Sequence, residues 1–288
     1  LWDREARTLS LVRDRIGEKP LYYGWSRGAF LFGSELKALR AWPTFEPEID
    51  RTALDWLVRR AYVPAPLSIY RNVYKLEPGC ILEIKERSKH RTERYWSYPA
   101  LVAEAQSNHI TDPREAIEGL EALLIDAVRR QSIADVPVGT FLSGGYDSST
   151  IAALQQHHTS SKVKTFTIGF DEPGFDEAPF ARGIAKHLGT DHHETRVTSK
   201  DALNLISRLA TIYDEPFADS SQIPTHLLSL AARDEVTVAL SGDGGDELFG
   251  GYNRHIYLQR HRQVLRRVPA GIRRGIASLI QRLGCERI

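Results

Sequence analysis

The chain has 288 residues, of which 42% are apolar and 26% are charged, and this fits one large or two medium-sized folded domains. Its formal net charge of +1 gives no reason to expect a nucleic acid or a membrane as a partner. Cys80 and Cys285 form no CxxC pair or metal-ligand spacing, and there is no signal peptide or long apolar run, so we expect a cytoplasmic protein.

Residues 1 to about 90 predict antiparallel strands joined by turns. The stretches LSLVRD, KPLYYGW and GAFLFGS are apolar or alternating, and Gly, Asp and Ser bound them. A helix is expected over residues 50–61, followed by turns at Pro64, Pro66 and Pro78. The polar stretch 85–108 has little periodicity, so we expect a linker between two domains there and place it at residues 91–112.

Helices and strands alternate from residue 112 onward. Asp112 and Pro113 give an N-cap and first-turn signal for a helix over residues 114–132. Apolar runs predict strands at 136–142, 163–168, 192–197 and 236–240. One helix is expected directly after the first of these strands, and two more are expected at 177–188 and 200–212. This order predicts an α/β domain, in which a parallel sheet carries helices on both faces.

A glycine loop, SGGYDSS from Ser143 to Ser149, follows the first of these strands. Its adjacent glycines permit a sharp turn and leave amide N–H groups free to face an anion, and the next helix adds unpaired amides and a positive dipole end. The spacing matches neither a Walker A loop, nor GxGxxG, nor a GxSxG elbow. Loop composition leaves two readings open, a phosphate cradle and an ordinary strand-to-helix turn.

A second cluster of glycines and acids, SGDGGDELFGGY from Ser241 to Tyr252, follows the strand at 236–240. Ligands bind at the carboxyl ends of the strands in an open parallel sheet, so we expect both loops to face one crevice. A calcium loop is the alternative reading, but its twelfth position, counted from Asp243, is Arg254 and not a carboxylate.

Two other features invite a functional reading. His187, His192 and His193 lack a regular metal-ligand spacing, and adjacent residues of a strand point to opposite faces. From Asn253 to Cys285 there are eight arginines and two histidines but no acid. This stretch fits either a helix that binds a nucleic acid or membrane surface, or a solvated or covered face of the protein itself.

The motifs together resemble those of glutamine-dependent asparagine synthetases of the bacterial type. The resemblance rests on SGGYDSS, TFTIGF, HLGTDHHE, DEPFADSSQIPT and SGDGGDELFGGY, which occur in the order of that family. It implies that residues 1–90 are the end of an antiparallel α+β glutaminase domain and that residues 113–288 belong to an ATP-pyrophosphatase synthetase domain. In the first part, RDRIGEKPLYY resembles the family's scaffold, so Arg13, Asp14, Gly17 and Lys19 are expected to be structural.

The resemblance also implies an activity, the ATP-dependent amidation of aspartate to asparagine. The reaction would pass through β-aspartyl-AMP, release AMP and pyrophosphate, and take nitrogen from glutamine or ammonia. ATP and Mg²⁺ are the implied cofactors, the other partners are small molecules, and a homodimer is one option. A related synthetase with another carboxylate substrate, forming an amide or a lactam, and a non-catalytic nucleotide-binding module are the alternatives.

Site residues follow from the same resemblance. The adenosine contacts match Leu142, Ile168 and Gly242, and Asp243 matches a position that manages a proton when ammonia attacks, with a turn-forming Asp as its alternative reading. Asp147 and Asp246 are expected to hold Mg²⁺. The pyrophosphate cradle is expected to contain Ser143, Gly144, Gly145, Asp147, Ser148, Ser149 and Ser241, and the acceptor pocket Asp219, Ser220, Ser221 and Gln222.

The chain begins at Leu1 and contains no Met, so we expect it to be part of a longer protein. The family's glutaminase uses an N-terminal cysteine as its nucleophile. The family also supplies a phosphate-neutralising lysine from further downstream, whereas the last lysine here is Lys200. The fragment by itself is therefore expected to be inactive.

Overall fold

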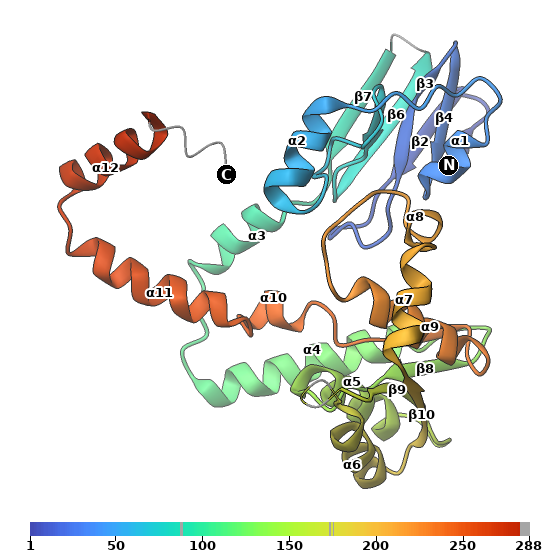
Figure 1. Ribbon diagram of the computed structural model, residues 1–288, viewed down its shortest axis with the longest axis vertical. Coiled ribbons are helices and arrows are strands. Elements are labelled where there is room, and N and C mark those ends of the chain that lie inside the picture. Colours follow the sequence, from blue (N-terminus) through green and yellow to red (C-terminus); the bar gives the residue numbers. More distant parts are fainter. Residues whose placement is uncertain (87–88, 173, 175, 283–288) are drawn as a thin grey trace. The chain divides into compact units, whose positions relative to one another are not determined.

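The computed structural model describes residues 1–86, 89–172, 174 and 176–282, which divide into two compact units (Figure 1). The first unit contains Leu1–Leu123, a short stretch that begins at Phe170, and Arg196–Leu230. The second unit contains Leu124–Gly169, Gly174–Thr195 and the chain from Ala231 onward. Cys80 is buried in the first unit, and Cys285 lies outside the described residues.

Two antiparallel sheets form the frame of the first unit. One sheet has the strand order β1-β2-β6-β7 and the other has the order β4-β3-β5. The strands are β1 (Trp2–Asp3), β2 (Thr8–Val12), β3 (Tyr22–Ser26), β4 (Ala29–Gly33), β5 (Val73–Lys75), β6 (Cys80–Glu86) and β7 (Lys89–Arg94). Arg27 and Gly28 both have positive φ, as a two-residue hairpin turn between β3 and β4 requires. The predicted antiparallel strands are confirmed.

The described residues of the stretch 85–108, where we expect a linker, contain regular secondary structure. Strand β7 pairs with β6, and helix α3 (Tyr98–Ala105) follows, with Ser97 as its N-cap. The described side chains of β7 are all exposed, so the strand has no buried face and shows no alternation of apolar and polar residues. Backbone pairing with β6 forms the strand instead.

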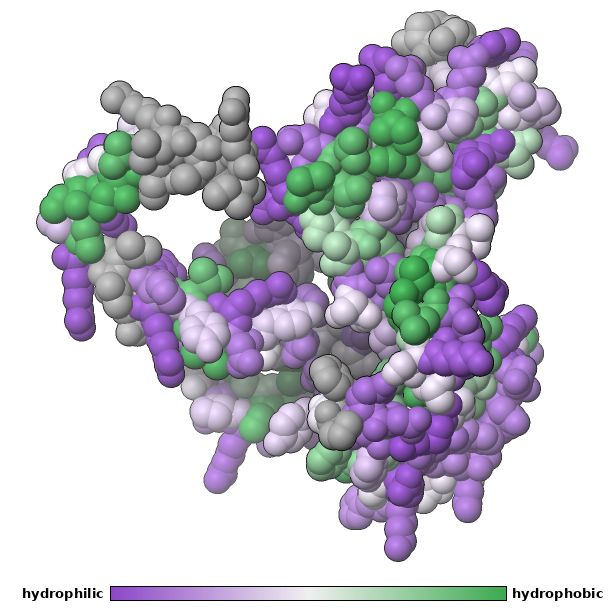
Figure 2. Space-filling view, viewed as in Figure 1, coloured by the Kyte–Doolittle hydropathy of each residue, from purple (hydrophilic) through white to green (hydrophobic). Residues whose placement is uncertain are grey.

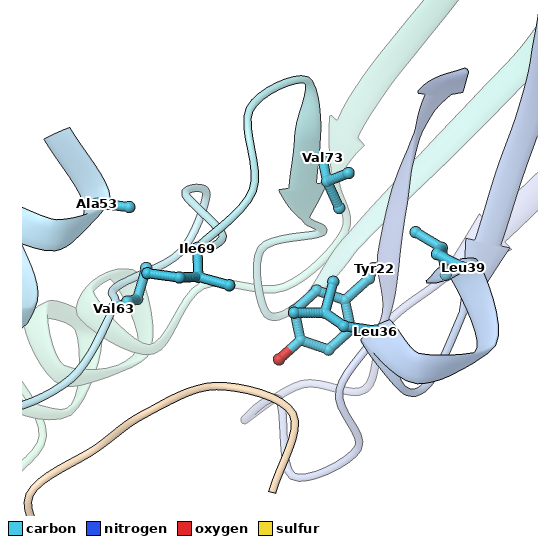
Figure 3. Close-up of a cluster of buried hydrophobic side chains, with 7 residues drawn as sticks. All are labelled: Tyr22, Leu36, Leu39, Ala53, Val63, Ile69 and Val73. Atoms are coloured by element: carbon cyan, nitrogen blue, oxygen red, sulfur yellow. The ribbon is translucent and has the colours of Figure 1, made fainter. Parts of the chain in front are cut away.

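A core cluster of Tyr22, Leu36, Leu39, Ala53, Val63, Ile69 and Val73 joins the second sheet to two helices (Figure 3). Helix α1 (Leu36–Arg40) contributes two leucines, and helix α2 (Arg51–Arg60) contributes Ala53. The Asp50 side chain caps α2 by accepting hydrogen bonds from the amides of Thr52 and Ala53, so the predicted helix is confirmed. The other side of α2 exposes Leu54 and Val58, and Figure 2 shows apolar surface over this helix.

The helix predicted over 200–212 is two helices in the structure. Helix α7 (Ser199–Ile206) begins with a capping box between Thr198 and Asp201, and it ends one turn before helix α8 (Leu209–Ile212). The next helix, α9 (Gln222–Arg233), is not among the predicted elements. Pro224 lies in its first turn, where a proline is tolerated.

The second unit is built on a four-stranded sheet of order β10-β9-β8-β11. Its strands are β8 (Val138–Phe141), β9 (Lys164–Phe170), β10 (Asp191–Val197) and β11 (Val238–Leu240). Both β9 and β11 pair with β8 in parallel. The helices that lie wholly or partly in this unit are α4 (Pro113–Gln131), α5 (Tyr146–His157), α6 (Ala178–Leu188), α10 (Gly245–Phe249), α11 (Asn253–Arg266) and α12 (Ala270–Arg282). The predicted parallel sheet with helices is confirmed.

The strand order of this sheet reverses at β8. The chain runs from β8 to β9 and on to β10 in one direction, and then returns to place β11 on the other side of β8. Leu240 of β11 pairs with Thr140 of β8, so both strands end at the same edge. Ligands of open α/β sheets bind beside such a switch point, at the carboxyl ends of the strands. The two glycine loops leave the sheet there.

Small residues let α5 and α6 approach each other closely. Ala152 of α5 and Ala181 and Ala185 of α6 are buried in one cluster with Leu142. This packing holds the N-terminal part of α6 against the loop that follows β8. Among the described residues, no helix is both long enough and apolar enough to cross a membrane.

Candidate active site

The first loop closes on itself through two serines. The Ser143 and Ser148 hydroxyls lie 2.9 Å apart, and the Ser143 amide donates to the Ser148 hydroxyl at 3.2 Å. The Gly145 amide donates to the Ser143 hydroxyl at 3.3 Å. These bonds fix the turn between β8 and α5, so the loop is held before any ligand binds.

Gly144 is required where it stands. Its φ is +84°, and a Cβ there would lie 2.8 Å from the Cβ of Phe180 and 2.9 Å from the amide nitrogen of Ala181. A side chain at this position would therefore be strained and would displace the start of α6. The glycine lets the loop backbone lie directly on that helix.

The start of α5 has unused hydrogen-bonding capacity. Its N-cap is Gly145, which has no side chain to bond the first amides of the helix. The Ser149 hydroxyl is buried and has no hydrogen-bond partner among the described residues. Unpaired amides, a helix dipole and a buried hydroxyl are the groups that an anion would satisfy. The residues present fit a phosphate group.

The second loop packs on the first. A Cβ on Gly242 would lie 2.7 Å from the Ser148 amide nitrogen, and a Cβ on Gly245 would lie 2.5 Å from a carboxylate oxygen of Asp147. The contact of Gly242 is with backbone and requires glycine, whereas the atoms nearest Gly245 belong to the end of the Asp147 side chain, which can move. Both contacts bring the loop after β11 onto the first turn of α5. These contacts bring the two loops together at the edge of the sheet where we expect them to face one crevice.

Asp147 and Asp246 come from different loops and have different surroundings. Among the described residues, neither carboxylate makes a hydrogen bond or an ion pair. Asp147 faces the backbone of Gly242 and Gly245, whereas Asp246 is turned toward Gly251, where an added Cβ would lie 1.9 Å from its Oδ1. Asp147 of the first loop and Asp246 of the second loop therefore both lie against backbone of the second loop.

These two free carboxylates fit Mg²⁺ as a binding partner. No group of three or more His, Cys, Asp or Glu side chains gathers for a metal within the described part of the chain. Mg²⁺ is usually held by one or two carboxylates together with phosphate oxygens of the substrate, so a complete protein cage is not needed. Asp147 and Asp246 would be the protein ligands of such a site.

Asp243 takes part in a local turn. The Ser241 hydroxyl donates to Asp243 Oδ2 at 3.1 Å, and the Asp243 amide donates back to the Ser241 hydroxyl at 3.4 Å. Asp243 is exposed, so it is open to a second role besides the turn. The two sequence interpretations of this residue are compatible with the same geometry.

The end of the second loop carries a polar group that sequence reasoning did not single out. The Tyr252 hydroxyl donates to Glu247 at 2.5 Å, and the Arg254 guanidinium lies 4.1 Å from the centre of the Tyr252 ring. This hydrogen bond lowers the pKa of Glu247 and raises the pKa of Tyr252. The available signal in the sequence was an acid, an aromatic residue and a cation, Glu247, Tyr252 and Arg254, within ten residues after Gly244 and Gly245.

The residues expected at the adenosine side lie in the sheet. Leu142 is buried, and its amide donates to the Phe166 carbonyl at 2.9 Å, which continues the pairing of β8 with β9. Ile168 is also buried, in the later half of β9. Their side chains are core residues, so any contact with adenosine would come from their backbone.

The residues expected in the acceptor pocket belong to the first unit. Asp219 Oδ1 accepts hydrogen bonds from the amide of Ser221 at 2.8 Å and from its hydroxyl at 2.7 Å, and these bonds lower the pKa of Asp219. The Gln222 side chain donates to the Asp219 carbonyl at 2.9 Å. Ser220 is exposed. The four residues form one turn at the start of α9.

The histidines of β10 have structural surroundings. His192 Nδ1 lies 2.9 Å from the Thr165 hydroxyl, and burial lowers the pKa of His192. The His193 ring stacks on Phe166 at 5.2 Å between centroids. The two side chains thus contact different neighbours, and no metal cluster of the described residues includes them.

The expected scaffold residues of the first unit hold a loop together. Arg13 donates to the carbonyls of Leu76 and Gly17, at 2.5 Å and 2.8 Å. The carboxylate of Asp14 accepts from the amides of Gly17, Glu18 and Lys19. Burial opposes the shift, but these three amides lower the pKa of Asp14. The contacts agree with a structural role.

Fold and loops together define the class of the protein. It is an α/β protein with a cradle for an anion at the switch point of a parallel sheet, preceded by an antiparallel unit. A family model described as asparagine synthase matches residues 119–285, which is more than half of the chain, and one described as a glutamine amidotransferase domain matches residues 1–96. The chain belongs to the asparagine synthase family.

Curated relatives agree with this assignment. The chain is 39% identical to a putative asparagine synthetase [glutamine-hydrolyzing] 2 of Methanocaldococcus jannaschii, over 95% of this chain and 52% of the relative. It is 33% identical to asparagine synthetase [glutamine-hydrolyzing] 1 of Bacillus subtilis, over 95% of this chain and 42% of that protein. It is also 33% identical to amidase chry2 of Gibberella zeae, over 88% of this chain and 39% of that protein. The chain spans about half the length of these relatives, or less.

The basic stretch from Asn253 lies within the asparagine synthase match. It forms α11 and α12, whose exposed apolar residues include Ile256, Ile272, Ile276 and Leu279. Because the family model continues through it, the stretch belongs to the family's own domain. A separate surface for a nucleic acid or membrane is not needed to account for it.

Proposed function

We propose that the protein makes asparagine from aspartate and ATP, with nitrogen from glutamine or ammonia. The single observation that carries this proposal is the contact of the two glycine loops, one after each strand at the switch point, in a chain of the asparagine synthase family. The two family matches support a division into a glutaminase part at residues 1–90 and a synthetase part at residues 113–288. We also infer a cytoplasmic location.

In the proposed first step, ATP binds with its pyrophosphate on the first loop. The amides at the start of α5 and the hydroxyls of Ser148 and Ser149 would bind the phosphate oxygens. Mg²⁺, held by Asp147 and Asp246, would neutralise charge on the departing pyrophosphate. A carboxylate oxygen of the aspartate side chain attacks the α-phosphorus, and the bond from this phosphorus to the pyrophosphate breaks. The products are β-aspartyl-AMP and pyrophosphate.

In the proposed second step, ammonia attacks the acyl carbon and AMP leaves. The nitrogen must lose a proton as the C–N bond forms, and a carboxylate within hydrogen-bond reach can accept it. Asp243 is our assignment for this base. Asp219, Ser220, Ser221 and Gln222 are our assignment for the acceptor pocket, since a turn of polar groups at a helix start suits a substrate with charged ends.

The acceptor is tested by pyrophosphate release from the full-length protein. Aspartate should stimulate release strongly, whereas glutamate and a blank without acceptor should not. Stimulation by another carboxylate in place of aspartate would contradict the proposal.

A second candidate is an amide-forming or lactam-forming synthetase with a different carboxylate substrate. It is favoured by one observation, the similarity to a protein named as an amidase. The ATP site would be the same in both cases, so the acceptor comparison separates them. A non-catalytic module would bind ATP but release no pyrophosphate with any acceptor.

A further inference from the structure

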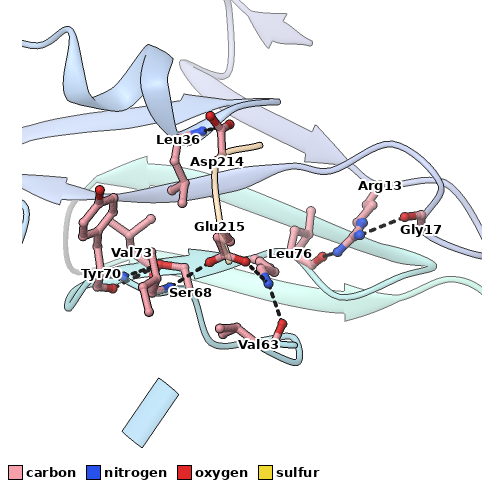
Figure 4. A network of polar contacts seen from close by, with 12 residues as sticks. Arg13, Gly17, Leu36, Val63, Ser68, Tyr70, Val73, Leu76, Asp214 and Glu215 are labelled. Atoms are coloured by element: carbon pink, nitrogen blue, oxygen red, sulfur yellow. Dashed lines mark hydrogen bonds and ion pairs between the residues drawn. The ribbon is translucent and has the colours of Figure 1, made fainter. Parts of the chain in front are cut away.

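A segment of the synthetase match folds with the amidotransferase part. Residues Arg196–Leu230 lie inside the asparagine synthase match, yet they belong to the first compact unit, which also contains the whole amidotransferase match. Within this unit, two adjacent acids, Asp214 and Glu215, point into the amidotransferase part (Figure 4). Neither residue belongs to the loops described above.

Asp214 caps a helix that is 178 residues away in the chain. Its Oδ2 accepts a hydrogen bond from the Leu36 amide at 2.5 Å, at the first residue of α1. The N-cap of that helix, Glu35, makes no side-chain cap, and the first turn contains no acid, so Asp214 supplies what α1 lacks. Lys37 adds an ion pair with Asp214 at 3.3 Å and a hydrogen bond to the Ile212 carbonyl at 3.3 Å.

Glu215 makes a largely buried ion pair. Its Oε2 pairs with the Lys75 ammonium, and the two side chains are only 10% and 13% exposed. Its Oε1 accepts from the Ile69 amide at 2.7 Å, while Lys75 also donates to the Val63 carbonyl at 2.6 Å. Every charge here has a partner, and removal of one member of a buried pair leaves the other uncompensated. Burial, and then the charge of Glu215, raises the pKa of the neighbouring Tyr22.

The segment makes a third contact through its backbone. The Ala218 amide donates to the Ala61 carbonyl at 2.7 Å, at the left-handed C-cap of α2. A cavity of about 350 Å³ lies beside these contacts and is lined by Tyr22, Lys75, Tyr213 and Phe217, among others. The segment 212–218 is therefore attached to α1, to α2 and to β5.

We propose that Asp214 and Glu215 form a docking clamp that couples glutamine hydrolysis to amide formation. The inference rests on the proposed function. Asp219, the first residue assigned to the acceptor pocket, lies four residues after Glu215, and four residues span at most about 14 Å. The clamp therefore fixes the start of this pocket on the part of the protein that supplies nitrogen. Both acids are positioning residues, since they touch neither loop.

The test uses the full-length protein with Glu215→Gln and with Asp214→Asn. Gln keeps an acceptor for the Ile69 amide but removes the charge that pairs with Lys75, and Asn keeps an acceptor for the Leu36 amide. Three quantities are measured: glutamate formed from glutamine, asparagine formed from ammonia, and asparagine formed per glutamine hydrolysed. The matched control is Glu48→Gln, which removes an exposed ion pair with Arg71 inside the amidotransferase part.

We expect the asparagine-to-glutamate ratio with glutamine to fall by about fivefold or more in both variants, while the two separate rates stay near wild type. Glu48→Gln should leave all three quantities unchanged. A wild-type ratio in folded variants would overturn the proposal. So would a parallel loss of both separate rates with a lowered melting temperature, because it would assign the two acids a purely structural role.

Failure of the proposed function gives a different result. In that case the wild-type protein forms no asparagine from either nitrogen source. The docking is then judged by hydrogen exchange, where Asp214→Ala should speed exchange at the Leu36 amide and Glu215→Ala at the Ile69 amide. Unchanged exchange at both amides would overturn the clamp independently of the reaction.

Discussion

Gly242 lies against the amide nitrogen of Ser148, so that a Cβ on the glycine would be 2.7 Å from that nitrogen. One residue follows β11 and the other lies in the first turn of α5. The contact joins the two loops and leaves no space for a side chain between them. An anion on the first loop would therefore bind beside the backbone of the second.

The first prediction concerns this contact. Gly242→Ala should lower kcat/KM for pyrophosphate release by about one to two powers of ten, because displacing the loops misaligns the bound phosphates. Gly183→Ala is the matched control, since Gly183 lies in α6 with open space around its Cβ position. The control should keep its activity and gain slightly in stability. Equal activity of both variants would show that the loops tolerate separation.

The second prediction concerns the metal. In the full-length protein, Asp147→Asn and Asp246→Asn should each reduce Mg²⁺-dependent pyrophosphate release by about two to three powers of ten, which corresponds to about 3–4 kcal/mol of barrier. The Mg²⁺ concentration for half-maximal rate should rise as well. Asp126→Asn, which removes only an exposed pair with Arg130 in α4, is the control. A wild-type Mg²⁺ titration in either site variant refutes that ligand.

The third prediction separates the two interpretations of Asp243. Asn at this position still accepts the hydrogen bond that the Ser241 hydroxyl donates, so the turn should survive, but the base is lost. Adenylate formation, measured as aspartate-dependent pyrophosphate release, should persist while the asparagine yield falls by about two powers of ten or more. If both quantities stay at wild-type levels, or both vanish together, the proton-transfer role is wrong.

The fourth prediction concerns acid stability. Burial lowers the pKa of His192 below its usual 6.5, with the charges of His193 and Arg182 in the same direction and Glu194 opposing them. The unfolded chain therefore binds this proton more readily than the folded chain. The stability that neutral His192 contributes is present above pH 6.5 and is lost as the pH falls from there toward the lowered pKa.

Urea denaturation of the wild type from pH 7.5 to 5 should show this loss. In His192→Gln the free energy of unfolding should change less over the same interval, because one of the groups linked to it is gone. His226→Gln is the informative comparison, since burial lowers the pKa of His226 too. A wild-type slope in His192→Gln would mean that His192 is not the linked group.

The sequence predicted those parts of the molecule whose pattern is local. The glycine and acid loops could be placed because short apolar runs precede them and carboxyl ends of parallel strands meet at one edge. Strand β7 was missed because its exposed side chains show no alternation, and the break between α7 and α8 was missed because apolar spacing continues across it. Both errors come from relying on the periodicity of side chains. Backbone pairing determines whether β7 forms, and capping determines where a helix such as α7 begins and ends.

Long-range polar contacts were beyond the reach of the pattern. The bond from the Leu36 amide to Asp214 and the pair of Lys75 with Glu215 join residues that are far apart in the chain. DEPFADSSQIPT was recognised as a family motif, but its first two acids gave no local signal of their partners. The Glu247, Tyr252 and Arg254 contacts were missed although they are local, because Glu247 lies inside α10 and the glycines after that helix gave no signal that the chain turns back toward it.

The central claim, that the side-chain carboxylate of aspartate is activated as an adenylate, is tested most directly by isotope transfer. Full-length protein is incubated with ATP, ammonia and aspartate that carries ¹⁸O in its side-chain carboxylate, and the AMP is analysed by mass spectrometry. Attack of this carboxylate on the α-phosphorus, followed by displacement of AMP, predicts one ¹⁸O atom in the phosphate of each AMP formed with asparagine. Unlabelled AMP, or ¹⁸O recovered in inorganic phosphate, would contradict the account.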